Sequence, residues 1–492
     1  MKDSLKDIIR EVNGIPRGEA PNLLIRWKPW EDHDYQVKYT DILMGLERPE
    51  VKAGETLVWM WDTVASIPCC DMTEDGIHAE DEAGELALRK EAGNVYGFPT
   101  TCWMPERDTV GSVALTYRFY PRVVPHDYRF RPYYDFRNEK NGATTTGVVT
   151  LAAPPKDQVY HVCEDWDLSE MPTDTRAVSI RGEGRQEYDA TPDEYRFTMS
   201  AVGRISEHIA YDGQVRIYWL NEPLPDRERI LRALPAIYKG LADFFEDSKA
   251  PYTIFFRKDP FEMSNGATAF TGGFVYGYSD EKPLNFDRAL DIFAHETIHT
   301  WPHIEDTHGE GTWYHEGTAE LYNILIPYRC GQTDLDFAAF QVTFRGINYY
   351  SNKYINMPNE EAWPLYWQDR EAQWLPYGRG FFYFVDIDYR LHKASGGKKR
   401  LDDLVLEMEH RRRNGESYTI REWEDMIRRE LGESEVERFR GIMNGAFIEP
   451  SEEWFDGAFT ISRGTVTDPV RGTVRENAYI WTKKPGVEKA DL

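Results

Sequence analysis

The chain has 492 residues, of which 41% are hydrophobic and 29% charged, and its formal net charge is −26. This length is enough for about three domains of roughly 150 residues and for large buried cores. The strong negative charge disfavours nucleic acid and anionic membranes as partners, and it leaves neutral or cationic substrates open.

The amino terminus, residues 1–10, is charged and amphipathic and lacks the continuous apolar core of a signal peptide. No stretch approaches the roughly 20 apolar residues of a membrane span. The cysteines are odd in number and include an adjacent pair, which is not typical of a disulfide framework: Cys69, Cys70, Cys102, Cys163 and Cys330. We therefore predict a cytoplasmic protein that does not enter a membrane. The sequence does not indicate its oligomeric state.

Residues 20–222 contain many short runs of strand-forming residues separated by Pro, Gly and Asp clusters, as expected for antiparallel sheets. The clearest runs are Asn22–Trp27, Tyr35–Met44, Thr56–Trp61, Ser112–Tyr120, Tyr195–Val202 and Val215–Leu220. Two prolines, Pro223 and Pro225, then interrupt regular structure. We predict an N-terminal antiparallel β-sandwich-like domain over residues 1–222.

After residue 223 the pattern becomes mainly helical. A helix is expected at Arg227–Glu246, then a strand at Tyr252–Phe256 and a Gly-rich stretch at Ala269–Tyr278. Further helices are expected at Leu335–Tyr350, Gly380–His392, Leu401–Arg412 and Arg421–Leu431, the last with a capping box from Thr419 and Glu422. The sequence predicts an α+β fold with a mainly helical domain at 223–395, a helical part at 396–450 and a short β-like tail at 451–492.

Within this helical part, Asp287–Trp301 has apolar residues at a period of about 3.6 and contains the motif HExxH. His295 and His299 are four residues apart, so on a helix both imidazoles face the same side and can bind one metal ion. Glu296, beside the first histidine, can reach a water molecule on that ion. This arrangement suits zinc hydrolysis, and we predict one Zn²⁺ per chain.

A third metal ligand is expected downstream. Pro302 and Glu305 stand where the metzincin pattern has glycine and histidine, so that pattern is excluded. Thr312–Tyr322 also reads as a helix, and its Glu316 completes a two-histidine, one-glutamate site that leaves a coordination position open for water. We favour Glu316 because it lies within a helix; the rival ligands are His308, His315, Glu305 and Glu310.

A carboxylate that accepts a hydrogen bond from the far nitrogen of a zinc-bound histidine fixes the orientation of that ligand. Glu320 is four residues after Glu316 on the same helix face, and Asp291 is one turn before His295. Either residue suits this role, and either also suits a solvated helix surface.

The motifs together resemble the gluzincin aminopeptidases, which include the aminopeptidase N type and the glycyl aminopeptidase family. The resemblance rests on His295-Glu296-x-x-His299-x-Trp301, on Trp313-x-x-Glu316-Gly317, on Pro376–Asp386, and on Gly396-Gly397-Lys398-x-x-Leu401-Asp402-Asp403. It implies a thermolysin-like zinc catalytic domain. It also implies that Tyr377 hydrogen-bonds the tetrahedral oxyanion and opens a buried helix.

The same resemblance implies that a Gly-rich strand binds substrate, here through Gly272, Gly273 and Tyr276. Val275 stands where these families have the glutamate that holds the free amino terminus of the substrate. Arg379 has two interpretations: it binds a substrate carboxylate, or it pairs with a neighbouring acid.

The leading hypothesis is a zinc metallopeptidase-like hydrolase that cleaves a peptide or small amide substrate, with Glu296 as general base and Tyr377 as oxyanion donor. One alternative is a zinc hydrolase acting on a non-peptide small molecule such as an epoxide, which the absent amine-binding glutamate favours. Another is a zinc-binding scaffold without turnover, against which the intact Glu296 argues.

Overall fold

The structure is a computed structural model of the whole chain. It describes all residues except 1–4, 65, 66, 70, 71, 73–75, 96, 128–133, 155, 248–250, 262–264, 282, 283, 308, 367, 468–471 and 491, and the side chains of 67, 287 and 288. Cys70 and the rival ligand His308 lie outside the described residues. The chain separates into two compact units, Met1–Leu231 with Pro251–Asn285, and Arg232–Ala250 with Phe286–Leu492.

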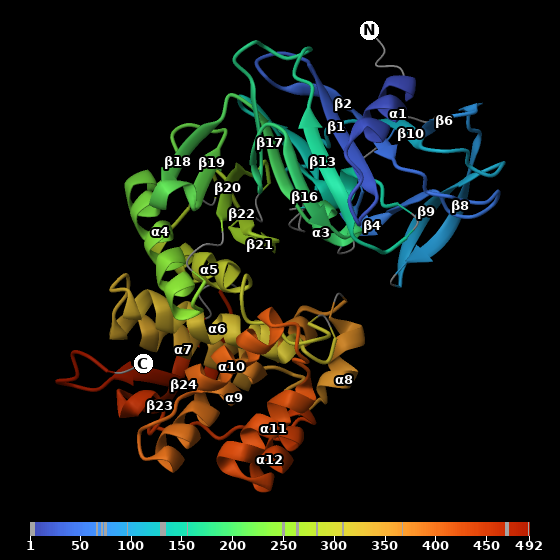
Figure 1. Cartoon of the computed structure of the whole chain (residues 1–492). Coiled ribbons are helices and arrows are strands. Elements are labelled where there is room, and N and C mark those ends of the chain that lie inside the picture. Colours follow the sequence, from blue (N-terminus) through green and yellow to red (C-terminus); the bar gives the residue numbers. More distant parts are fainter. Residues whose placement is uncertain are drawn as a thin grey trace. The chain divides into compact units, whose positions relative to one another are not determined.

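The first unit is built on a seven-stranded sheet in the order β16-β13-β1-β2-β10-β6-β7 (Figure 1). Its strands are β1 (Asn22–Glu31), β2 (Val37–Leu46), β6 (His78–Asp81), β7 (Gly84–Glu85), β10 (Val113–Phe119), β13 (Tyr160–Trp166) and β16 (Gln186–Ala190). Most pairs are antiparallel, but β1 and β13 run parallel. The prediction of antiparallel sheets is therefore wrong for the β1–β13 pair, which the sequence did not indicate because β13 follows β1 by more than a hundred residues.

Two further sheets of this unit contribute to the same apolar core. One has the order β3-β9-β8, and the other β11-β12-β17-β14-β15. Their strands are β3 (Val58–Trp61), β8 (Leu88–Val95), β9 (Phe98–Pro105), β11 (Phe136–Glu139), β12 (Gly142–Thr146), β14 (Arg176–Ser179), β15 (Gly182–Glu183) and β17 (Met199–Gly203), with β4 (Thr63–Val64) and β5 (Ile67–Pro68) as a separate pair. Alternating apolar residues supply the core because successive side chains of a strand face opposite sides.

Short helices complete these sheets. The amphipathic helix α1 (Leu5–Gly14) packs Ile8, Ile9 and Val12 on Leu24, Leu43, Ala114 and Cys163. The helices α2 (Gly147–Thr150) and α3 (Pro192–Arg196) follow β12 and β16. The predicted strand Tyr195–Val202 is wrong in its first half, because Thr191 and Glu194 form a capping box that starts α3. The strand β17 begins only at Met199.

A five-stranded sheet, β18-β19-β20-β22-β21, ends the first unit. It consists of β18 (Ser206–Ala210), β19 (Val215–Trp219), β20 (Tyr252–Lys258), β21 (Gly266–Phe270) and β22 (Gly273–Tyr278). The Gly-rich stretch thus forms the turn and second strand of the hairpin β21–β22. Because β20, β21 and β22 form one sheet with β18 and β19, they belong to the first compact unit. The domain limits at residues 222, 395 and 450 stay predictions.

The second unit is mainly helical, as predicted (Figure 1). Most of α4 (Arg227–Phe244) belongs to it, with α5 (Phe286–Ile298), α6 (Thr312–Arg329), α7 (Leu335–Tyr350), α8 (Asn359–Ala362), α9 (Arg370–Ser395), α10 (Leu401–Arg413), α11 (Ile420–Leu431) and α12 (Glu433–Met443). The capping box predicted from Thr419 and Glu422 starts α11. Fully buried rings from four helices form the aromatic core of this unit, namely Trp313, Tyr383, Phe384, Trp423 and Phe439.

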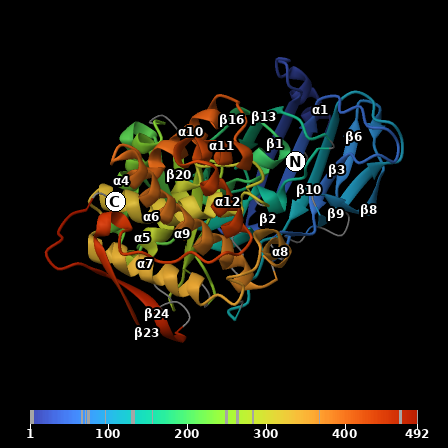
Figure 2. The ribbon, with the colours of Figure 1, turned by 90° about the horizontal axis from the view of Figure 1, so that it is seen from below.

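The strand-like tail forms a hairpin of β23 (Phe459–Thr467) and β24 (Val474–Lys483), which packs along α7 (Figure 2). Trp481 lies against Gly346, where a β-carbon would come within 2.6 Å of the indole. Its backbone N–H donates to the Thr343 hydroxyl at 2.9 Å. Among the described residues, no helix combines the length and apolar character needed to cross a membrane.

Candidate metal centre

The helix α5 carries the HExxH motif and ends one residue before its second histidine. His295 and Glu296 lie in the last turn, and His299 lies in the turn that follows. There Thr300 and Trp301 donate to carbonyls three residues back, at 3.2 and 2.9 Å, rather than four. The predicted end at Trp301 is therefore late, because Pro302 has no N–H and disfavours helical backbone in the residue before it.

The helix α6 follows this motif in the chain, packs against α5 and is buried from Thr312 to Pro327. It brings Glu316 to both histidines. The Nε2 atoms of His295 and His299 are 3.0 Å apart, and Glu316 Oε2 lies 3.4 Å from the first and 3.6 Å from the second. Tetrahedral ligands bound at about 2.1 Å would lie about 3.4 Å apart. The three donor atoms therefore fit one zinc ion.

Electrostatics at these donors also favour a cation. Burial of the His295 imidazole opposes its charged form, but the carboxylates of Glu316 and Glu320 outweigh burial and raise the pKa of His295 well above its usual value. The surroundings of His295 therefore favour positive charge, which a divalent ion supplies.

Of the two carboxylates proposed to orient a ligand, Glu320 has the contact. Its Oε1 lies 3.1 Å from His295 Nδ1, which leaves Nε2 directed at the other donors. Its Oε2 lies 2.6 Å from Arg345 Nε on α7. Burial raises the pKa of Asp291 to about 6, with Arg345 opposing and Glu320 adding to the shift. Arg345 could not be predicted from the sequence, since 25 residues separate it from Glu320 and no motif joins them.

Within the described residues, the rival ligands His315, Glu305 and Glu310 are not part of this donor group. His315 is buried, and its ring stacks on the His299 ring with centroids 4.0 Å apart. Its Nδ1 is 3.4 Å from the carbonyl oxygen of Pro302. Neither Glu305 nor Glu310 belongs to a potential metal-binding group within the described residues.

The helix α9 carries Tyr377 to the same place. Its ring stacks parallel to the His295 ring, with centroids 6.0 Å apart and an interplanar angle of 4°. Burial and the Glu316 carboxylate raise the pKa of Tyr377 well above its usual value, so the hydroxyl is protonated and can donate. The Tyr366 hydroxyl lies 3.2 Å from that of Tyr377, a contact between residues that no sequence motif links.

Tyr377 lies inside α9, which corrects the prediction that it opens a helix at about Gly380. The helix begins at Arg370 because the Asp369 side chain caps it, accepting from Glu371 N at 2.9 Å. It continues through Pro376.

Two glycines allow α6 and α9 to approach closely. A β-carbon on Gly317 would come within 2.6 Å of Gly380 Cα, and one on Gly380 would come within 2.1 Å of the Trp313 carbonyl oxygen. Gly317 follows Glu316 directly, and Gly380 is three residues after Tyr377. Backbone contact at these glycines therefore sets the separation of Glu316 and Tyr377.

Arg379 is fully buried on α9, and its guanidinium donates to the Ile355 and Met357 carbonyl oxygens at 2.8 and 2.7 Å and to the Asn359 side chain. These contacts hold the segment before α8. The hydrogen-bond partners are backbone and amide oxygens rather than an acid, and a part for Arg379 in substrate binding stays a prediction.

The Gly-rich residues lie in the first unit. Gly272 has a φ of +80° in the β21–β22 turn, and a β-carbon on Gly273 would meet the Thr253 carbonyl oxygen at 2.0 Å. Tyr276 is buried and donates to Asn265 Oδ1 at 3.1 Å. These contacts explain why the turn and strand need these residues. The part of Gly272, Gly273 and Tyr276 in substrate binding stays a prediction.

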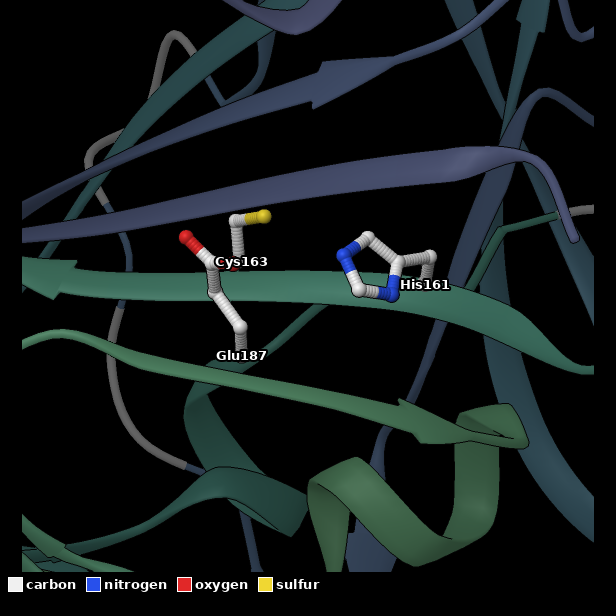
Figure 3. A group of neighbouring side chains, drawn as sticks. All are labelled: His161, Cys163 and Glu187. Atoms are coloured by element: carbon white, nitrogen blue, oxygen red, sulfur yellow. The ribbon is translucent and has the colours of Figure 1, made fainter. Parts of the chain in front are cut away.

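A second group of donors lies in the first unit, where His161 and Cys163 of β13 and Glu187 of β16 point to one side of the sheet (Figure 3). Cys163 is fully buried against α1, and burial raises the pKa of its thiol. Arg185 forms an ion pair with Glu187 at 3.0 Å, and its charge and hydrogen bond act on Cys163. A metal ion binds the deprotonated thiolate and is repelled by a neighbouring guanidinium. This group is therefore a weaker candidate for a metal site than His295, His299 and Glu316.

The sequence matches no family model and no curated protein. Solved structures match the fold. An aminopeptidase N family protein from Idiomarina loihiensis is similar with a TM-score of 0.65 and 14% identity, over 91% of this chain and 80% of that one. Leukotriene A4 hydrolase from Saccharomyces cerevisiae gives 0.54 and 12%, over 88% and 69%. Yeast LTA4 hydrolase in complex with bestatin gives 0.51 and 11%, over 92% and 73%. The predicted resemblance to the aminopeptidase N type is thus confirmed at the level of the fold.

Proposed function

We propose that this chain is a zinc-dependent hydrolase of the aminopeptidase-like gluzincin type that cleaves a peptide or amide bond. The observation that carries the proposal is the set of three donor atoms, from His295, His299 and Glu316, whose separations of 3.0 to 3.6 Å suit one tetrahedral ion. Glu296 adjoins the first of these ligands on the same helix. A structural zinc site would use four protein ligands, whereas these three leave a position for water.

The chemistry divides between the metal and the side chains. A zinc ion, when bound, lowers the pKa of water and polarises the carbonyl group of the substrate. Glu296 accepts the proton of the attacking water and passes it to the leaving amine. The Tyr377 hydroxyl donates a hydrogen bond to the oxygen that becomes negative as the carbonyl carbon turns tetrahedral. Glu320 holds the His295 ring in the tautomer that keeps Nε2 available.

The Gly-rich strand of this chain differs in sequence from that of an aminopeptidase. Val275, at the position of the amine-binding glutamate, is fully buried in an apolar cluster that includes Phe255 and Phe270. A valine side chain offers no charge to an ammonium group. We therefore expect that a free amino terminus contributes little to binding, and that N-acetylated amides are cleaved about as fast as free aminoacyl amides.

The same observation favours a second candidate, a zinc hydrolase that acts on a non-peptide small molecule. One structural neighbour is named a leukotriene A4 hydrolase, so this fold also occurs in an enzyme that is not named for a peptide. In this case the ligands and Glu296 keep their roles, and water attacks an epoxide or an amide that lacks a peptide framework.

The test is a panel of free aminoacyl amides, the same amides N-acetylated, and small epoxides, each assayed with the zinc-loaded protein and its Glu296→Gln variant. Cleavage of either amide set that the variant loses supports the first proposal, and similar rates for the two sets support the absence of amine recognition. Turnover of epoxides alone supports the second candidate. Stoichiometric zinc uptake without any turnover would refute both and leave a scaffold.

A further inference from the structure

The second unit contains a buried arginine that contacts no predicted ligand but holds the residue that orients one. We infer that Arg345 is a positioning residue of the metal centre, which fixes Glu320 and through it the His295 ring. This inference rests on the proposed zinc site. Beyond that proposal, it assigns part of the metal affinity to a side chain that is not itself a ligand.

The contacts of Arg345 use both sides of its guanidinium. The side chain lies on α7 and is 4% exposed, which excludes water as its main partner. Nε faces Glu320, 2.6 Å from Oε2 and 3.1 Å from the backbone carbonyl oxygen. Nη1 donates to Gln341 Oε1 at 2.8 Å, and Nη2 donates to Asn323 Oδ1 at 2.8 Å. The guanidinium plane is therefore held by α6 and α7 together.

Glu320 divides its two oxygens between two partners. Oε2 is taken by Arg345, and Oε1 is left for His295 Nδ1 at 3.1 Å. A buried carboxylate with an imidazole as its one partner would carry an uncompensated negative charge, which is costly in a buried site. Arg345 neutralises that charge and removes the rotation of the carboxylate about its terminal bond.

The consequence for His295 is geometric. Its ring is useful to the metal only if Nδ1 carries the proton and Nε2 points at Glu316 and His299. A carboxylate fixed by Arg345 holds that tautomer and that ring plane before the ion arrives. Without Arg345 the carboxylate turns or takes up a proton, and metal binding must then order the ring.

The planar fork of arginine matters as well as its charge. A lysine at this position keeps a cation near Glu320 but cannot also donate to Gln341 and Asn323. We therefore expect Arg345→Lys to weaken zinc binding less than Arg345→Met. Losses of about 10- to 100-fold in metal affinity are typical when a carboxylate behind a metal-bound histidine is disturbed.

The experiment measures zinc affinity of the full chain by chelator competition, which needs no substrate. The variants are Arg345→Met, Arg345→Lys, Glu320→Gln, and Arg345→Met combined with Glu320→Gln. The matched control is Arg329→Met, because Arg329 also lies on this helical unit and pairs with an acid, Asp402, at 2.9 Å. The d–d absorption of the Co²⁺-substituted proteins reports the ligand geometry at saturating metal, which a purely structural role would leave unchanged.

We expect Arg345→Met to lower the zinc affinity about tenfold or more and to alter the Co²⁺ spectrum. When Glu320→Gln is already present, adding Arg345→Met should lower the zinc affinity by no more than about twofold. Affinity and spectrum equal to those of Arg329→Met would overturn the inference, as would losses that simply add. If Arg345→Met does not fold, judged by circular dichroism of the metal-free protein, Arg345→Lys decides by the same criteria. Failure of the unaltered protein to bind zinc would instead refute the proposed function.

Discussion

The contact of α6 with α9 at Gly317 gives a prediction whose size follows from the structure. The β-carbon of Gly317→Ala would lie 2.6 Å from Gly380 Cα and 2.7 Å from Gly380 C, whereas ordinary contact begins at 3.4 Å. These atoms are backbone and cannot rotate away, so the helices must separate by about 0.8 Å.

Two effects on stability oppose each other in this variant. Alanine is favoured over glycine inside a helix by about 1 kcal/mol. Overpacking a tight interior costs about 1–3 kcal/mol. The second effect wins because the clash is between backbones, so we expect a net loss of up to about 2 kcal/mol and a lower melting temperature. The displacement also moves Tyr377 relative to Glu316, and an error of about 1 Å can lower turnover by about 100-fold.

The assay combines thermal unfolding with turnover of whichever substrate the panel identifies. The matched control is Gly441→Ala in α12, where the nearest atom to the new β-carbon is 3.9 Å away. The control variant should gain up to about 1 kcal/mol and keep full activity. If Gly317→Ala were as stable and as active as Gly441→Ala, the argument that this glycine sets the helix separation would be refuted.

Three further outcomes follow from the site. Glu296→Gln should retain stoichiometric zinc by metal analysis but lose about 100- to 10,000-fold in kcat, and a retained kcat would remove Glu296 as general base. Tyr366→Phe removes the hydroxyl 3.2 Å from that of Tyr377 and should lower kcat about 2- to 10-fold with KM little changed. The control Tyr389→Phe, at a tyrosine of α9 that pairs with the exposed acid Glu453, should change neither. The pKa of Asp291 is raised to about 6 in the folded protein, so the folded state binds the extra proton and stability falls as pH rises from about 4 to 6. Asp291→Asn should therefore stabilise the metal-free protein at pH 7.5 by up to about 3 kcal/mol and much less at pH 4, and equal effects in denaturant titrations at the two pH values would contradict this.

The order of the elements was readable from the sequence because it depends on local periodicity. The runs at Asn22–Trp27 and Val215–Leu220 became β1 and β19, and the helical stretch after His299 became α6 with Glu316 inside it. Element ends were less predictable, because single residues determine them. Pro302 shortened α5, Asp369 started α9 ten residues early, and Thr191 turned half of an expected strand into α3.

Other features required the tertiary structure because they join residues that no local pattern links. The parallel pairing of β1 with β13, the burial of Arg379 among carbonyl oxygens, and the approach of Arg345 to Glu320 are of this kind. Each arises from the packing of segments that are separated in the chain. For Arg379 and Arg345, burial makes an unpaired charge costly, so a partner must be present.

For the candidate site, the sequence by itself determined that His295 and His299 face the same side. They are four residues apart, and residues at that spacing lie on one face of a helix. Only the tertiary structure shows that Glu316 brings a carboxylate oxygen within 3.6 Å of both Nε2 atoms, whereas His315 stacks its ring on His299. It likewise shows that the carboxylate in contact with His295 Nδ1 is that of Glu320. The physical reason is that α5 and α6 are joined by a loop whose length does not specify their rotation. That rotation is set by which faces can be buried and by how closely two glycines let α6 and α9 approach.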